Sequence, residues 1–182
     1  MENTAYLDNF EKILSDGLVK VCQGASLLDD SGILDSPDID LKWDVYIKDY
    51  VADAVENFNS YPQTAIAWAG FLGMGVAHRW DRDFELFKSA TYQSYYGPRG
   101  FDDMDEFVLQ NVLGLDLDGA EARKISDTFN SMSMLTLGLI RHEGVEPQTA
   151  QGFYILNRSY TVLYKIGASI ALRRLGYRKV LI

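Results

Sequence analysis

The sequence has 182 residues, 47% of them hydrophobic and 24% charged, which indicates a folded globular protein and excludes a disordered chain. The formal net charge of −9 disfavours a nucleic-acid partner, because the overall charge repels phosphate. The single cysteine, Cys22, has no partner for an internal disulfide, so we expect a reducing, cytoplasmic compartment. We predict one soluble domain over residues 1–182.

Helical spacing begins at the N-terminus. Asn3 or Thr4 is expected to cap a first helix that ends near Gly24, with apolar residues three and four positions apart. A polar loop follows up to Pro37. A second helix is predicted to begin at Asp38 or Asp40 and to end at the break before Pro62. Its apolar face carries Trp43, Ile47, Tyr50, Val51, Ala54 and Phe58.

The third predicted helix, from Pro62 to about Trp80, contains an apolar segment that is rich in glycine and alanine, Ala65–Ala77. Each interior glycine costs a helix about 0.5–1 kcal/mol relative to alanine, so tertiary packing must compensate. Every fourth residue is small, which predicts a row packed against a close neighbouring helix: Ala65, Ala69, Gly73 and Ala77. We expect that neighbour in the same chain, with a homodimer as the alternative. The run is too short to span a bilayer, so no transmembrane helix is expected.

Further helices are expected in the second half of the chain. Asp81 or Asp83 is predicted to cap a segment that stops before Gly97, and Asp103 and Asp118 each begin an Asp-x-x-Glu pattern typical of a capping box. The last helix is predicted over about Gln148 to Leu175, closed by Gly176. The tail 177–182 fits a short strand, a docked segment or a frayed end. The complete pattern predicts an all-α bundle of six to seven helices around the glycine/alanine-rich central helix.

Two histidines and two carboxylates form the candidate metal site: His78, Asp81, His142 and Glu143. Imidazole and carboxylate together suit a divalent metal such as zinc, iron or manganese, which would make the protein a metal-dependent enzyme. However, the chain contains neither the Glu-x-x-His pair of di-iron bundles nor a His-Glu-x-x-His zinc motif. The simpler interpretation is that both histidines lie in the last turn of a helix, where a cationic imidazole interacts favourably with the helix dipole.

A second candidate region combines aromatic residues with an arginine near a predicted loop: Trp80, Tyr92, Tyr95, Tyr96 and Arg99. Tyrosine, tryptophan and arginine are enriched at binding surfaces. Tyrosines are equally common where helices pack and the hydroxyl reaches a polar partner. The region is therefore either a binding surface or part of the core.

Charge is distributed unevenly, because no acidic residue follows Glu146. The C-terminal segment contains six basic residues, Arg158, Lys165, Arg173, Arg174, Arg178 and Lys179. This asymmetry is typical of an electrostatic adaptor for an anionic surface, or of a basic helix packed among acidic neighbours of its own fold. The absence of a catalytic motif leaves binding or assembly as the expected role, with a metal-dependent enzyme and an electrostatic adaptor as alternatives.

Overall fold

The computed structural model describes residues 3–146 and 148–178, and the part of the chain it describes is helical with no named strand. The chain forms α1 (Thr4–Gly24), α2 (Pro37–Phe58), α3 (Pro62–Arg82), α4 (Phe84–Ser89), α5 (Met104–Phe107), α6 (Ala120–His142) and α7 (Ala150–Arg174). Short 3₁₀ turns occupy Tyr92–Tyr95 and Phe101–Asp103, and a π-helical turn, η3, occupies Val108–Val112. The prediction of an all-α bundle of six to seven helices is confirmed, with seven α-helices among the described residues.

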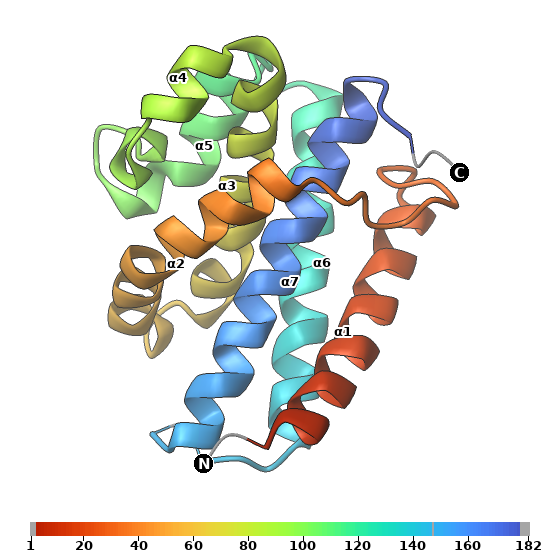
Figure 1. The fold of residues 1–182 in the computed structure, drawn as a ribbon, viewed down its shortest axis with the longest axis vertical. Helices are drawn as coiled ribbons and strands as arrows, with labels where there is room; N and C mark the ends of the chain where they lie inside the picture. Colours follow the sequence, from red (N-terminus) through yellow and green to blue (C-terminus); the bar gives the residue numbers. More distant parts are fainter. Residues whose placement is uncertain (1–2, 147, 179–182) are drawn as a thin grey trace.

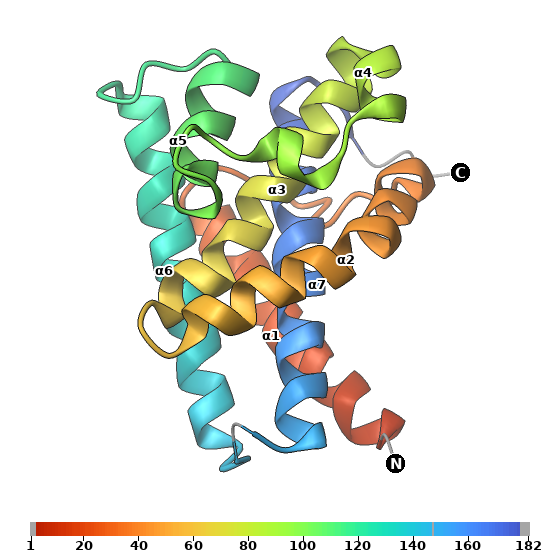
Figure 2. The same ribbon diagram turned by 90° about the vertical axis from the view of Figure 1, so that its left-hand side faces the viewer.

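Three long helices, α1, α6 and α7, run along the long axis of the molecule, and α2 crosses them on one side (Figure 1). α3 lies between α2 and α7 and packs most extensively against α7. The view turned by 90° shows α5 above the space between α3 and α6 (Figure 2). α3 therefore contacts α2, α6, α7 and η3, which places the glycine-rich helix at the centre of the bundle.

Several helix ends follow their sequence signals. The Asn3 side chain accepts a hydrogen bond from the Tyr6 amide at 3.2 Å, Pro62 occupies the first turn of α3, and Asp83 caps α4. Gly176 follows α7 with φ of 99°, a left-handed conformation that glycine adopts without strain. These residues act locally, so each was among the residues that the sequence predicted for its helix end, and the structure selects Asn3 over Thr4 and Asp83 over Asp81.

Other boundaries were predicted wrongly. α2 begins with Pro37 after Ser36, earlier than either predicted aspartate, and neither capping box forms. The Asp103 carboxylate turns back to accept from the Arg99 amide at 2.8 Å, and α6 begins after Gly119 rather than Asp118. The Asp103 carboxylate binds the preceding loop, and the Asp118 amide donates to the Asp116 side chain at 3.0 Å, which helix-start patterns do not reveal.

Close contact between α3 and α7 explains the row of small residues. A Cβ atom added at Gly73 would lie under 3.0 Å from the backbone carbonyl of Tyr164. On the opposing helix, a Cβ added at Gly167 would clash in the same way with the Gly70 carbonyl. Ala65, Ala69 and Ala77 are fully buried. The neighbour of the glycine-rich helix is thus α7 of the same chain.

Candidate ligand-binding site

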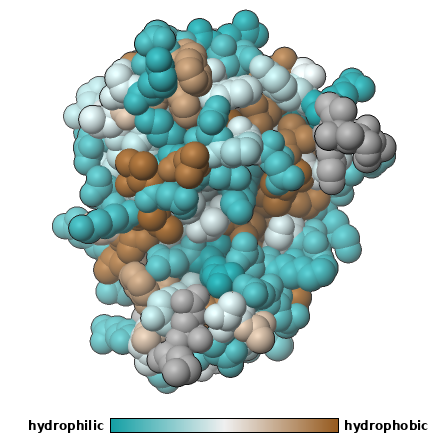
Figure 3. Space-filling model, viewed as in Figure 1, coloured by the Kyte–Doolittle hydropathy of each residue, from teal (hydrophilic) through white to brown (hydrophobic). Residues whose placement is uncertain are grey.

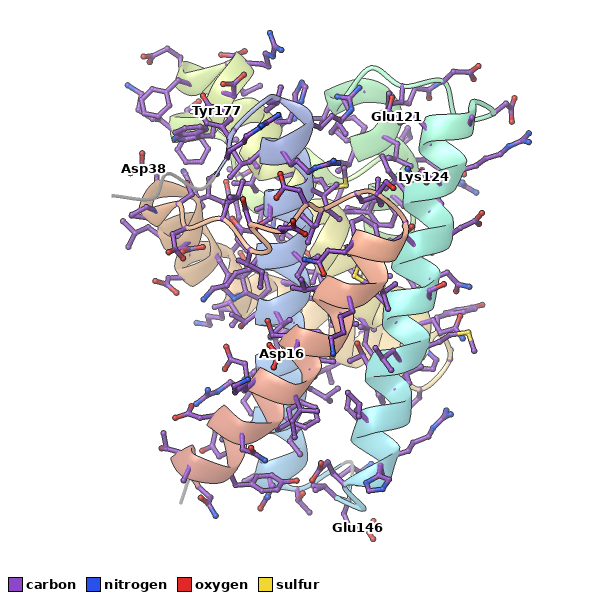
Figure 4. All side chains as sticks on the ribbon, turned by 90° about the vertical axis from the view of Figure 1, so that its right-hand side faces the viewer. Asp16, Asp38, Glu121, Lys124, Glu146 and Tyr177 are labelled. Carbon is purple, nitrogen blue, oxygen red and sulfur yellow. The ribbon has the colours of Figure 1, made fainter. Side chains whose placement is uncertain are left out.

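The predicted metal ligands lie in two groups at opposite ends of α6. His78 and Asp81 are at the end of α3, near Arg174, whose guanidinium pairs with Glu121 in the first turn of α6 at 2.5 Å. His142 and Glu143 lie at the other end of α6, a helix of 23 residues and therefore about 35 Å long. Figure 4 labels Glu121 at one end of this helix and Glu146 just beyond the other. One metal ion cannot bridge the two groups.

Both carboxylates of the predicted metal site already have partners. Asp81 accepts a hydrogen bond from the Tyr177 hydroxyl at 2.6 Å, and Glu143 accepts one from the Tyr6 hydroxyl. Burial lowers the pKa of His78, and the charge of Arg174 lowers it further. Among residues 3–146 and 148–178, no group of three or more His, Cys, Asp or Glu side chains is placed to hold a metal ion.

The aromatic candidates are divided between core and surface. Tyr92 and Tyr95 are 2% and 0% exposed, and the hydroxyls of Tyr92 and Tyr96 both donate to Asp53. The structure therefore places these tyrosines in the packing between α2 and the loop after α4, not on one binding surface.

The other two members of that predicted surface have separate partners. The Trp80 indole lies against Tyr177, with ring centroids 5.5 Å apart, and its N–H faces Asp38. Arg99 is exposed and forms an ion pair with Asp103 at 2.7 Å. Trp80 and Arg99 therefore belong to different local clusters.

The basic residues of α7 face acidic residues of the same chain. Arg158 contacts Asp8 and Glu11 on α1 at 2.7 and 2.6 Å. Near the other end of the helix, Arg173 donates to the Ser26 carbonyl at 2.7 Å and Arg174 pairs with Glu121. Lys165 attracts the carboxylate of Asp40, Arg178 is exposed, and Lys179 lies outside the described residues. This arrangement explains the charge asymmetry as attraction between α7 and its acidic neighbours.

A pocket that the sequence did not reveal lies between α3, α5 and α6, with a volume of about 220 Å³. Its apolar part consists of Trp68, Phe71 and Phe129, which contact one another edge to face at 5.4 and 4.5 Å between ring centroids. Its polar lining comes from Gln63 and Thr64 on α3, Asp105 on α5, and Ser126, Asn130 and Ser133 on α6. We call this cavity the Asp105 pocket.

Asp105 is the charged residue of this pocket. Its side chain is partly buried, and no described basic side chain forms an ion pair with it. The pKa of Asp105 is raised to about 6: burial is the largest cause, the negative charges of Glu106 and Asp103 also raise the pKa, and nearby backbone amides partly oppose them. A carboxyl group with this pKa in a cavity is a feature of functional sites, because a bound ligand can supply the missing counter-charge.

Backbone and hydrogen-bond constraints position the pocket walls. The Trp68 indole donates to the Phe101 carbonyl at 2.8 Å, which fixes the ring against the loop that leads to α5. α5 continues directly into the π-turn Val108–Val112, and π-turns in helical segments occur frequently at functional sites. Gly70 lies behind the pocket, where an added Cβ would be 3.1 Å from the Phe129 ring.

Sequence reasoning missed this pocket because its residues come from three separate segments. Asp105 lies between Asp103 and Glu106, the two residues of the predicted capping box, and the sequence pattern gave its own carboxylate no role. The one available signal was the polar series Ser126, Asn130 and Ser133, spaced along one side of α6 next to Phe129. That spacing is common on half-exposed helices and does not by itself indicate a ligand.

Comparison with known proteins found no matching family model, curated protein or solved structure. A search of the described helices for one long and apolar enough to cross a bilayer found none. The Asp105 pocket combines an aromatic wall, hydrogen-bonding amide and hydroxyl groups, and one carboxylate without a cationic partner among the described residues.

Proposed function

We propose that the protein is a binding protein whose Asp105 pocket takes a small ligand with a positively charged nitrogen. The observation that carries this proposal is the position of the Asp105 carboxylate, which is partly buried beside aromatic rings and has no ion-pair partner among the described basic side chains. An ammonium or guanidinium group would restore the charge balance through charge-assisted hydrogen bonds.

The other walls suit the same ligand class. Trp68, Phe71 and Phe129 provide aromatic surface, and a cation over an aromatic face gains about 0.5–2 kcal/mol depending on desolvation. The hydroxyl and amide side chains of the lining can orient polar substituents of the ligand. The volume of about 220 Å³ lies below the usual ligand-site range of about 300–1,000 Å³, which favours a compact ligand.

Trp68 supplies the readout for a direct test. We would titrate the protein with ethylamine, methylguanidine and tetramethylammonium, and with the neutral analogue acetamide, while recording tryptophan fluorescence. Trp68→Phe identifies the responding ring. Cations are expected to bind above pH 6, where Asp105 is ionised, and to weaken as the pH falls.

Asp105→Asn should abolish the cation response, because the amide cannot supply the negative charge. The matched control is Asp102→Asn, which removes an exposed carboxylate from the same segment and should leave the affinity unchanged. Equal binding of cations and acetamide, or an unchanged affinity in Asp105→Asn, would refute the proposal.

A second candidate function is assembly through α2. Its outer face carries four exposed apolar residues: Leu41, Val45, Ala52 and Val55. With Lys48 between Val45 and Ala52, these positions are spaced alternately by four and three residues, which is the pattern of a helix–helix interface. Leu41 and Val45 are 62% and 67% exposed, and Figure 3 shows hydrophobic side chains gathered over α2. The partner we propose is a second copy of this chain, because two-fold dimers are the commonest homo-oligomers and would pair α2 of one copy with α2 of the other.

Light scattering after size-exclusion chromatography tests this assembly. The parent chain is expected to be dimeric, and Val45→Asp should convert it to a monomer. The matched control is Met134→Asp, which introduces the same charge at an exposed apolar position of α6. This variant should have the same molar mass in solution as the parent dimer. A monomeric parent at high concentration would exclude the dimer.

We also propose a cytoplasmic location. Cys22 is fully buried, and burial raises the pKa of its thiol to about 12, so the reduced form is protected inside the core. Cell fractionation of tagged protein tests the location directly, and recovery in an extracellular or membrane fraction would contradict it.

A further inference from the structure

A second cavity, distinct from the Asp105 pocket, opens where α2 ends and α6 meets the start of α7. It has a volume of about 290 Å³. Most of its lining is apolar and comes from three parts of the chain, which are the turn between α2 and α3, the end of α6 with the loop after it, and the start of α7: Phe58, Pro62, Leu137, Ile140, Val145 and Ile155. The remaining lining includes Asn59, Gly152 and one charged residue, Arg141.

Arg141 gives this cavity a charge preference. It is exposed in the last turn of α6, and the described part of the chain forms no ion pair with it. The nearest acidic residue in sequence, Glu143, is hydrogen-bonded to Tyr6 on α1 instead. A guanidinium beside an apolar cavity can bind a carboxylate through two parallel hydrogen bonds while the cavity takes the attached hydrocarbon.

We infer that this cavity binds a small aliphatic carboxylate, with the hydrocarbon tail among the apolar side chains and the carboxylate at Arg141. Its volume lies at the lower limit of about 300 Å³ for ligand sites, so a short, unbranched tail fits better than a long acyl chain. The two polar side chains of the lining, Asn59 and Arg141, are both exposed, and the other lining side chains are apolar. The site therefore selects for a charged head and an apolar tail.

The length of the ligand provides the first test. Burying one CH₂ group contributes about 0.8 kcal/mol, which corresponds to about a fourfold gain in affinity. Titration calorimetry with butanoate, hexanoate and octanoate should show this gain with each added methylene until the cavity is full. Affinity that does not increase with chain length would mean that the tail remains in water, and it would overturn the inference.

The head group provides the second test. Octanoate is expected to bind at least tenfold more tightly than octanol or octylamine, because only the carboxylate pairs with Arg141. Arg141→Gln should reduce octanoate affinity by about tenfold and leave octanol affinity unchanged. The matched control is Arg123→Gln, which removes an exposed arginine from the other end of α6 and should have no effect.

Three results would each overturn the inference: no octanoate binding at millimolar concentration, equal affinity of octanoate for the parent and Arg141→Gln, or tighter binding of octylamine. Arg141 is exposed, so its substitution leaves the core intact, and circular dichroism confirms that each variant is folded. Asp105→Asn separates this site from the proposed cation site, since octanoate binding should be unaffected by that change.

Discussion

Replacement of Gly73 by alanine is expected to destabilise the protein, although alanine is the better helix former. The added methyl group would lie under 3.0 Å from the Tyr164 carbonyl and 3.0 Å from the Ala168 amide nitrogen. Both neighbours are backbone atoms of α7, so no side-chain rotation can relieve the contact. α3 and α7 must separate locally, and the surrounding core loses contact with them.

The expected magnitude combines two opposing contributions. Overpacking a core costs about 1–3 kcal/mol, and backbone neighbours place this site at the upper end. The gain in helix propensity offsets up to about 1 kcal/mol. The net loss is about 2 kcal/mol, equivalent to a decrease of about 4–8 °C in Tm for a protein of this size. Gly73→Leu adds more volume and should be more destabilising.

Gly138→Ala is the matched control on α6. A Cβ atom at Gly138 would meet nothing within 4 Å, so only the propensity gain remains. This variant should be more stable by about 0.5–1 kcal/mol. Thermal and urea unfolding, followed by circular dichroism, measure both changes. If Gly73→Ala were as stable as the parent, or if both substitutions shifted Tm in the same direction, the proposed close contact between α3 and α7 would be refuted.

Three further predictions follow from buried and charged groups. Asp105→Asn should raise the free energy of unfolding at pH 7.5 by about 1–2 kcal/mol, because the folded state disfavours the ionised carboxylate. The raised pKa sets an upper bound of about 3 kcal/mol on this effect, and contact of the carboxylate with solvent reduces it. Urea titrations should show this stability difference shrinking as the pH falls from about 6 to 4, because Asp105 becomes protonated in the folded parent at a higher pH than in the unfolded chain. A difference that grows over this range would contradict the prediction. The Cys22 thiol, with its pKa raised to about 12, should react with a thiol reagent at pH 7 only when the chain unfolds, and rapid labelling of the native protein would disprove its burial. Arg158→Gln should lower stability by about 1 kcal/mol or less, with the loss diminishing at high salt, since the Asp8 carboxylate that it contacts is exposed; a salt-independent loss would indicate a packing role instead.

The candidate ligand-binding site shows why sequence patterns identified elements better than sites. The Asp105 pocket combines residues from α3, α5 and α6, and the pKa of its carboxyl is raised chiefly because it is buried where these helices meet. Conversely, His78 and His142 have suitable metal-ligand chemistry but are separated by the length of α6. Residue type and spacing along one helix do not determine which helix ends meet in space.

The sequence by itself determined the helical class, the single cysteine and the close contact required by the small-residue row, and it limited two helix caps to Asn3 or Thr4 and to Asp81 or Asp83. These features depend on local hydrogen bonds, on 3.6-residue periodicity, or on side-chain volume, all of which are present in a short stretch of chain. Only the tertiary structure decided that this row faces α7, that Tyr92 and Tyr95 are core residues, and that the basic residues of α7 face acidic neighbours. The physical reason is that burial and ion pairing depend on contacts between segments far apart in the chain, such as Arg158 with Asp8, and those contacts form only when the helices pack.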